Sequence, residues 1–243
     1  MIEAEFGQPR DLSAMIGVLS RGGGDPAYRR GADGQIWLTG LGPQGSVSMR
    51  LRPAAGVITA QFWGEGAQWA ADHLEDLLGG HDDPAGFVPV HPIIERQWRR
   101  YRDTLRVPRS LLTWQIAVAA VLEQRVTGVE ARGAWRGLVS EHGSPAPGPV
   151  PGRMRIPPDP ARVLRVPSWD WRRYGVDRQR IATVREVARC AHLLSETCLR
   201  LSVTMHRDTT RLKYFRTTIQ FRIAHKLGGL LTNIETFGAT ETR

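Results

Sequence analysis

Short apolar stretches separated by turn-forming residues dominate the first quarter of the chain. The alternation of apolar and polar positions predicts strands at residues 13–19, 35–41, 46–51 and 57–62. Glycine and proline punctuate the segments between them, most densely at residues 22–26. We therefore expect a small antiparallel sheet in this part of the chain.

After the last of these strands, the apolar spacing changes to a helical period. Residues 66–78 place large apolar side chains three and four positions apart, and Gly79-Gly80 supplies a helix stop. Longer helical patterns begin beyond this point, so we predict a β-rich N-terminal domain over residues 1–80 and a mainly helical domain from residue 81. The expected fold class is α+β: a small N-terminal antiparallel β-sheet domain with a helix, followed by an α-helical domain.

The second region carries the strongest helical signals. A helix from residue 111 or 112 to residue 124 has almost no polar face, which is typical of the centre of a bundle. Thr127-Gly128-Val129-Glu130 fits a capping box that begins the next helix. The inward stripe of that helix is expected to consist of Ala131, Ala134, Trp135, Leu138 and Val139.

Two further segments complete the expected organisation. Residues 143–160 are rich in proline and glycine and predict a linker. Residues 179–195 predict a helix, with Arg185 and Arg189 on its solvent side.

The charge balance favours an anionic partner without requiring one. Lys and Arg number 33 against 24 acids, which gives a formal charge of +9. Nearly all the bases are arginine, whose planar fork pairs with phosphate. A genome that encodes arginine in place of lysine explains the excess equally well. The same two interpretations apply to the basic run before the buried helix: phosphate contact or a solvated helix face. That run contains Arg99, Arg100, Arg102, Arg106 and Arg109.

Several classes of protein are excluded or disfavoured. With two cysteines, Cys190 and Cys198, the chain builds neither a disulfide framework nor an iron–sulfur site. The seven histidines show no zinc-binding spacing, and no phosphate-loop motif occurs. No apolar run is long enough for a membrane span. We expect no metal, no cofactor and no membrane association, and a cytoplasmic monomer.

The stretch QIAVAAVLEQRVTGVEA, residues 115–131, resembles the helix–loop–helix entry of helix–hairpin–helix base-excision glycosylases. Three other stretches agree in order and spacing with the DNA-3-methyladenine glycosylase II family, at residues 23–30, at residues 86–92, and at residues 166–171 together with 175–177. Together the resemblance covers roughly residues 12–197. It implies a β-rich domain followed by a helical glycosylase domain, which agrees with the boundary drawn from the apolar pattern.

The resemblance also implies an activity and a site. Members of this family hydrolyse the N-glycosyl bond of alkylated bases flipped out of duplex DNA, and an inserted side chain holds the gap open. Gln124, Arg125 and Val126 occupy the position of that wedge, with Thr127 and Gly128 at the helix start near phosphate. An ordinary exposed turn is the alternative interpretation of this loop.

Two tryptophans, Trp169 and Trp171, are candidates for base stacking. We favour packing within the fold for both, because alternating tryptophans at a helix entrance usually contact their neighbours.

The resemblance stops at about residue 197. Relatives continue with a Leu-Pro-Gly-Val-Gly hairpin that grips phosphate and a catalytic aspartate, and residues 198–243 show neither. The acids of this segment are Asp208, Glu235 and Glu241, and none has the family context, so no catalytic residue is assigned. We therefore expect a partial glycosylase domain over residues 81–197 and a divergent tail over residues 198–243, produced by a frameshift, a gene-model error or gene decay, or else by genuine divergence.

Three functions follow as hypotheses. The first is a DNA-3-methyladenine glycosylase-like protein of base-excision repair whose partner is double-stranded DNA containing alkylated bases. The second is a non-catalytic DNA-binding remnant, and the third is a decayed gene product without function. In the last two, the hairpin and the catalytic aspartate are missing.

Overall fold

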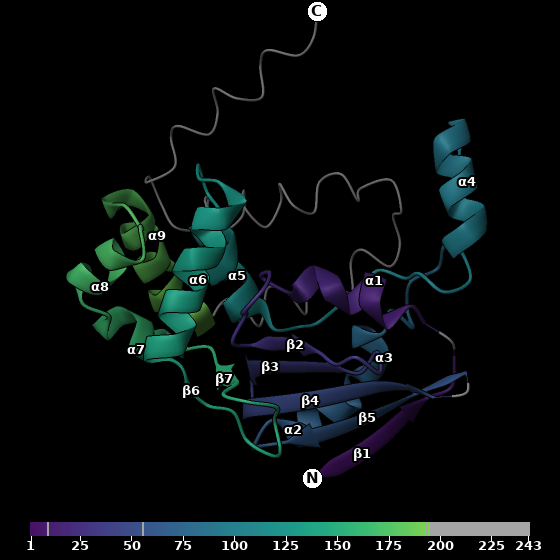
Figure 1. Cartoon of the computed structure of the whole chain (residues 1–243), viewed down its shortest axis with the longest axis horizontal. Helices are drawn as coiled ribbons and strands as arrows, with labels where there is room; N and C mark the ends of the chain where they lie inside the picture. The colour runs from purple at the N-terminus through teal and green to yellow at the C-terminus, as the bar shows by residue number, and fades with distance from the viewer. Residues whose placement is uncertain (9, 55, 193, 195–243) are drawn as a thin grey trace, which may run out of the picture. The chain divides into compact units, whose positions relative to one another are not determined.

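The computed structural model describes residues 1–8, 10–54, 56–192 and 194 (Figure 1). These residues belong to one compact unit, Met1–Cys198, and a second unit, Leu199–Arg243, lies outside the description. Within the first unit, strands and short helices come first in the chain and longer helices follow. The strands are β1 Ile2–Phe6, β2 Tyr28–Arg30, β3 Ile36–Gly42, β4 Gly45–Ala54, β5 Val57–Trp63, β6 Ser144–Pro145 and β7 Arg155–Ile156. The helices are α1 Leu12–Ile16, η1 Gly17–Leu19, α2 Ala67–Asp72, α3 Leu74–Leu77, α4 Pro92–Tyr101, α5 Thr113–Leu122, α6 Gly128–His142, α7 Pro160–Arg165, α8 Ser168–Arg173 and α9 Arg178–Arg189.

A five-stranded antiparallel sheet forms the N-terminal part, in the order β1-β5-β4-β3-β2. Strands β3, β4 and β5 confirm three of the four predicted strands, with ends that differ by at most three residues. The predicted α+β class is confirmed. The division at residue 80 falls between α3 and α4 and stays a prediction.

The fourth predicted strand, residues 13–19, is wrong: this segment forms α1 and η1. The side chain of Asp11 accepts a hydrogen bond from the Ala14 amide at 3.0 Å and caps the helix. Leu12, Met15 and Ile16 then share one helical face that is buried against the sheet. Strands β1 and β2 lie at the edges of the sheet and were not predicted. The apolar positions of β1 are interrupted by Glu3 and Glu5, and β2 has three residues, two of which are arginine.

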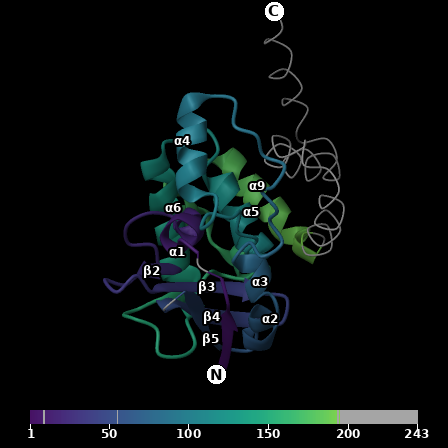
Figure 2. The ribbon, with the colours of Figure 1, turned by 90° about the vertical axis from the view of Figure 1, so that its right-hand side faces the viewer.

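One face of the sheet supports the N-terminal core. Helices α2 and α3 pack on this face, as Figure 2 shows, and α1 adds its apolar side. The predicted single helix over residues 66–78 is interrupted at His73, and Gly79 follows α3 with φ +62°. Leu112 inserts into the same core and is 1% exposed, which joins the segment before α5 to the sheet.

The segment predicted as a linker, residues 143–160, is fastened to the sheet. It contains the β6–β7 pair, and the Arg155 amide donates to the Pro26 carbonyl at 2.8 Å. The Thr39 hydroxyl donates to the Arg155 carbonyl at 2.6 Å. Gly148 lies so close to the Trp63 side chain that an added Cβ would come within 2.4 Å of it. These contacts fix the β6–β7 segment beside β3 and β4.

The helices α5, α6 and α9 form the core of the second part. Helix α5 contacts α6, α9 and β3, and the whole predicted inward stripe of α6 is buried. Helix α9 confirms the helix predicted over residues 179–195 as far as Arg189. Arg189 is exposed as predicted, but Arg185 is half-buried and donates to the Val166 carbonyl at 3.1 Å. The prediction of a solvent-facing Arg185 is therefore wrong, because α7 packs against α9 at this point.

The two tryptophans of α8 have opposite environments. Trp171 is fully buried, in agreement with the expectation of packing, whereas Trp169 is 72% exposed. The packing interpretation therefore fails for Trp169.

Helix α4 has no buried residue. Its Arg99 pairs with Glu95, and beyond the helix Arg109 pairs with Asp76 at 2.8 Å. Part of the positive charge of the basic run over residues 99–109 is thus offset by acids of the same chain. Among the described helices, none has the length and apolar character needed to cross a membrane.

Candidate nucleic-acid interface

Four of the five residues predicted to bind DNA lie in the loop between α5 and α6, and the fifth, Gly128, is the first residue of α6. The four are Gln124, Arg125, Val126 and Thr127. Two backbone amides at the start of this loop bond the last turn of α5. The Glu123 amide donates to the Ala119 carbonyl at 3.0 Å, and the Gln124 amide donates to the Val121 carbonyl at 3.1 Å. The side chains of Gln124 and Arg125 are exposed, and the side chain of Val126 is partly buried. The predicted residues therefore form one contiguous exposed turn, and their contact with DNA stays a prediction.

Arg125 has a left-handed backbone, with φ +56°. This conformation costs roughly 1–2 kcal/mol for a residue with a Cβ, and glycine is the usual residue at this position after a helix. Leu111 is the other non-glycine residue with positive φ in the described part of the chain, and its side chain packs against the N-terminal core. The Arg125 side chain is exposed, in contrast to that of Leu111.

The predicted capping box at the start of α6 is confirmed. The Glu130 carboxylate accepts from the Thr127 amide at 2.9 Å and from the Thr127 hydroxyl at 2.8 Å. The Thr127 hydroxyl oxygen in turn accepts from the Glu130 amide at 3.4 Å. The hydrogen bonds from Thr127, that of its backbone first, hold the pKa of Glu130 below its ordinary value. The box thus fixes the far end of the exposed turn.

This lowered pKa predicts an acid-sensitive contribution to stability. The contribution of Glu130 is fully present above its ordinary pKa of 4.5 and is lost as the pH falls through the lower pKa of the folded state. We expect wild type to be more stable than Glu130→Gln at pH 7 in urea denaturation. We expect this difference to shrink at acid pH below 4.5. A difference that is constant with pH would contradict the contribution of the ionised carboxylate.

Arg180 fixes the near end of the turn, and sequence reasoning missed it. It extends from α9 and is 6% exposed, although arginine is rarely buried without partners. Its guanidinium donates to the Leu122 carbonyl at 3.0 Å, to the Gly175 carbonyl at 2.8 Å and to the Asp177 carboxylate at 2.7 Å. The hydrogen bonds from Arg180 also lower the pKa of Asp177. The last carbonyl of α5 is therefore held by a charged donor inside the fold.

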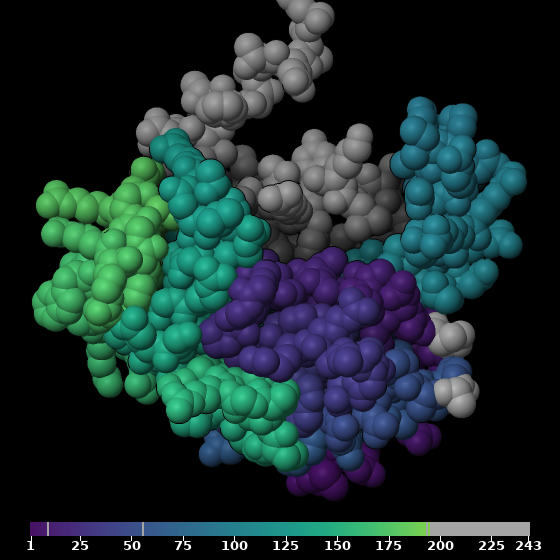
Figure 3. Space-filling view, viewed as in Figure 1, coloured from purple at the N-terminus to yellow at the C-terminus, as the bar shows by residue number. Residues whose placement is uncertain are grey.

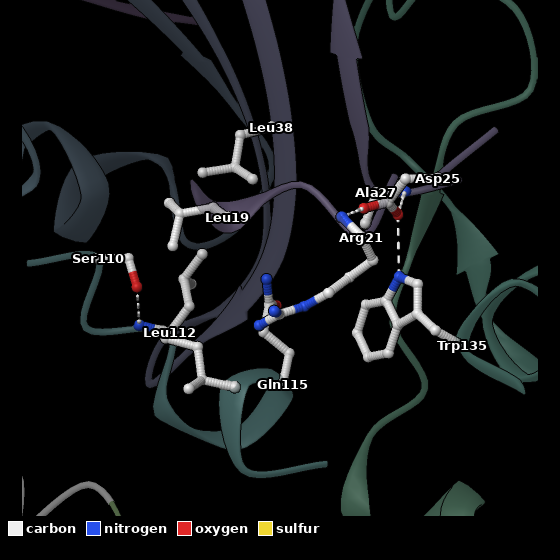
Figure 4. Close-up of a pocket in the computed structure, with 10 residues that line it drawn as sticks. Leu19, Arg21, Asp25, Ala27, Leu38, Ser110, Leu112, Gln115 and Trp135 are labelled. Carbon is white, nitrogen blue, oxygen red and sulfur yellow. Dashed lines mark hydrogen bonds between the residues drawn. The ribbon is translucent and has the colours of Figure 1, made fainter. Parts of the chain in front are cut away.

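A glycine-rich segment from the N-terminal part lies against the same loop. We call residues 20–25 the glycine segment. Its Arg21 pairs with Glu123 at 3.2 Å. Its Asp25 is buried and accepts from the Arg21 amide at 2.7 Å, the Ala27 amide at 2.9 Å and the Trp135 indole at 2.9 Å (Figure 4). The N-terminal residues accordingly lie directly against α6 in Figure 3.

A small hollow lies between the glycine segment and α5. In Figure 4 the Arg21 side chain extends across it toward Gln115. Its space for solvent is only about 10 Å³, which is enough for about one water molecule. As formed by the described residues, it has no room for a purine base. Its lining consists of Leu19, Arg21, Asp25, Ala27, Leu38, Ser110, Leu112, Gln115, Ile116 and Trp135.

A second polar cluster lies at the end of α6. Ligand atoms of Glu141, His142 and Asp170 lie within 4.8 Å of one another. Arg173 already bonds both carboxylates, and Tyr174 donates to Glu141 at 2.8 Å. Burial, followed by the bond to Glu141, raises the pKa of Tyr174 to about 12. Because a guanidinium occupies the position of a cation, this cluster is an ion-pair network and supports no metal assignment.

The acids considered as catalytic candidates fall into two groups. Asp208, Glu235 and Glu241 lie outside the described residues. The two acids beside the exposed turn, Glu123 and Glu130, are paired with Arg21 and with the capping threonine. No catalytic role is therefore assigned at this turn.

Comparison with known proteins identifies the fold. No protein-family model and no curated protein matches the sequence. Among solved structures, the chain is similar to a 3-methyladenine DNA glycosylase from Archaeoglobus fulgidus, with a TM-score of 0.62 and 14% identity over 77% of this chain. It is also similar to MBOgg1 in complex with a low-affinity DNA ligand, with a TM-score of 0.60 and 12% identity over 93% of this chain and 71% of that one.

A third similar structure is the 8-oxoguanine glycosylase/lyase from Clostridium acetobutylicum in its apo form, with a TM-score of 0.56 and 7% identity over 79% of this chain and 66% of that one. The chain spans 66% of the length of the Archaeoglobus enzyme. The fold is therefore that of DNA glycosylases.

Proposed function

We propose that this chain binds duplex DNA through the α5–α6 turn, as a glycosylase-like protein of base-excision repair. The observation that carries the proposal is Arg125, an exposed arginine in a strained backbone conformation. The turn that presents it is fixed at one end by Arg180 and at the other by the capping box. A side chain held on such a turn suits insertion at a vacated base site, where the gap in the stack must be kept open.

The finer proposal is recognition of alkylated bases followed by hydrolysis of the N-glycosyl bond. It is supported by the likeness to a 3-methyladenine glycosylase and by the sequence resemblance around residues 115–131. Gln124 and Val126 would flank the inserted Arg125, and Thr127 and Gly128 would lie near phosphate at the start of α6.

A second candidate function is binding of damaged duplex without hydrolysis. The pairing of both acids beside the turn favours it, because neither Glu123 nor Glu130 is available to stabilise a cationic sugar or to activate water. The two candidates share the same DNA interface and differ only in the chemical step.

The test of the interface uses the full chain and two fluorescent duplexes, one intact and one with an abasic site. Arg125→Ala should weaken binding to the abasic duplex about tenfold and binding to the intact duplex much less. The matched control is Arg52→Ala, which removes an exposed arginine from β4 of the sheet and should change neither. Equal, small effects of the two substitutions would reject the wedge.

The test of the chemistry is release of free base from methylated duplex DNA. A preparation from cells that carry the empty vector controls for host glycosylase. Release by the purified chain would establish hydrolysis, and Asp208, Glu235 and Glu241 would then be substituted in turn. Lesion-selective binding without release would establish the second candidate, and failure to bind either duplex would overturn both.

A further inference from the structure

Arg132, on the second turn of α6, is exposed beside the proposed wedge. It makes no hydrogen bond and no ion pair with any residue that the structure describes. Its neighbour one turn along, Arg136, is different, because it donates to the Gly23 carbonyl at 2.8 Å. The guanidinium of Arg132 is thus not paired with an acid of the described part of the protein.

The side chain of Arg132 is nevertheless held in a defined place. A Cβ added to Gly22 would lie 2.2 Å from Arg132 Cδ, and one added to Gly128 would lie 3.0 Å from its Nη1. The stem therefore rests on the glycine segment, and the guanidinium lies at the first turn of α6. Packing of the stem reduces the conformational entropy that the side chain loses when it binds a ligand.

The acids around this position are all engaged elsewhere. Glu123 pairs with Arg21 at 3.2 Å. Glu130 is bound within the capping box, and Asp25 is buried with three donors. The positive charge of Arg132 is therefore not neutralised by these three acids. An exposed, pre-positioned guanidinium of this kind suits a phosphate, which it binds through two parallel hydrogen bonds.

We propose that Arg132, seated between Gly22 and Gly128, binds a backbone phosphate of duplex DNA next to the Arg125 turn. The inference rests on the proposed function, since it assumes that this face of the protein meets DNA. The glycine segment contributes to this binding because Gly22 has no side chain, which leaves the space that the Arg132 stem occupies. The contact positions the duplex and is independent of base sequence.

The test measures how the affinity for both duplexes depends on salt. Arg132→Ala should reduce the slope of log affinity against log salt concentration by about 1 and weaken binding at low salt roughly five- to tenfold. The loss should be the same for intact and abasic duplex. Arg132→Lys should keep most of the slope, because the charge remains, and Arg52→Ala should leave the slope unchanged.

A second variant tests the seat itself. Gly22→Ala places a Cβ where the Arg132 stem lies, and it also strains a backbone with φ +88°. Gly24→Ala is the matched control, since Gly24 has φ +77° and a Cβ there does not meet Arg132. Gly22→Ala should therefore weaken binding as Arg132→Ala does and more than Gly24→Ala, and the double variant with Arg132→Ala should bind no more weakly than Gly22→Ala alone. If Gly22→Ala does not fold, the slope of the Arg132 variants decides the matter alone. An unchanged slope for Arg132→Ala, with the preference for abasic duplex intact, would overturn the phosphate site only. Absence of any DNA binding by wild type would overturn the proposed function with it.

Discussion

Replacing Arg125 with glycine should leave the protein as stable as wild type, or slightly more stable, while removing its preference for damaged duplex. The left-handed backbone at φ +56° costs an arginine roughly 1–2 kcal/mol that a glycine does not lose. The greater freedom of glycine in the unfolded chain offsets about 0.4–1 kcal/mol of this gain. The net change in the free energy of unfolding should therefore lie between about 0 and 1.6 kcal/mol, in the direction of stabilisation. Urea denaturation and the two-duplex binding assay measure the two effects.

Gln124→Gly supplies the matched control for this experiment. Gln124 is the neighbouring exposed residue of the turn and is not among the residues with positive φ. Glycine there relieves no strain and should lower stability by roughly 0.5–1 kcal/mol. A loss of stability for Arg125→Gly equal to that of the control would show that the arginine stabilises the turn. Retention of the preference for abasic duplex would show that Arg125 is an ordinary turn residue.

The sequence predicted those parts of the fold whose signals are local. Strands β3, β4 and β5 follow from alternation bounded by turns, and α6 follows from a capping box and a periodic stripe. The segment over residues 13–19 was assigned wrongly because a short apolar run fits either period. The deciding signal was Asp11, whose side chain caps α1.

The candidate site was predicted only in part, because its remaining features depend on contacts between distant segments. The residues of the exposed turn were named from sequence, but the strain at Arg125 is a property of the folded backbone. Arg21 and Glu123 are 102 positions apart, and no local pattern indicates that they pair. Arg180 had one local sign, an aspartate three positions earlier at the helix start, yet its bond to Leu122 spans 58 positions.

Substitution of Arg180 should lower the stability of the protein strongly. Arg180→Ala removes a buried guanidinium and leaves the Leu122 and Gly175 carbonyls without their donor. The Asp177 carboxylate is largely exposed and stays solvated, so the cost comes mainly from the two carbonyls. A buried acceptor left without its donor costs about 1–3 kcal/mol, against a total stability of about 5–15 kcal/mol for a domain. We expect a large fall in the urea midpoint, and Arg180→Met should recover little of it because the methionine packs but donates no hydrogen bond.

Arg178→Ala is the control, since Arg178 is exposed on the same helix and should change stability by about 0.5 kcal/mol or less. Similar midpoints for Arg180→Ala and Arg178→Ala would contradict the anchoring role.

Arg180 links stability to binding, because the Leu122 carbonyl that it bonds is the last one of α5 before the exposed turn. Arg180→Ala that remains folded at low temperature should therefore also lose part of its preference for abasic duplex, although Arg180 itself is buried and cannot reach the DNA. An unchanged preference in the folded variant would mean that the capping box and the Arg21–Glu123 pair suffice to hold the turn.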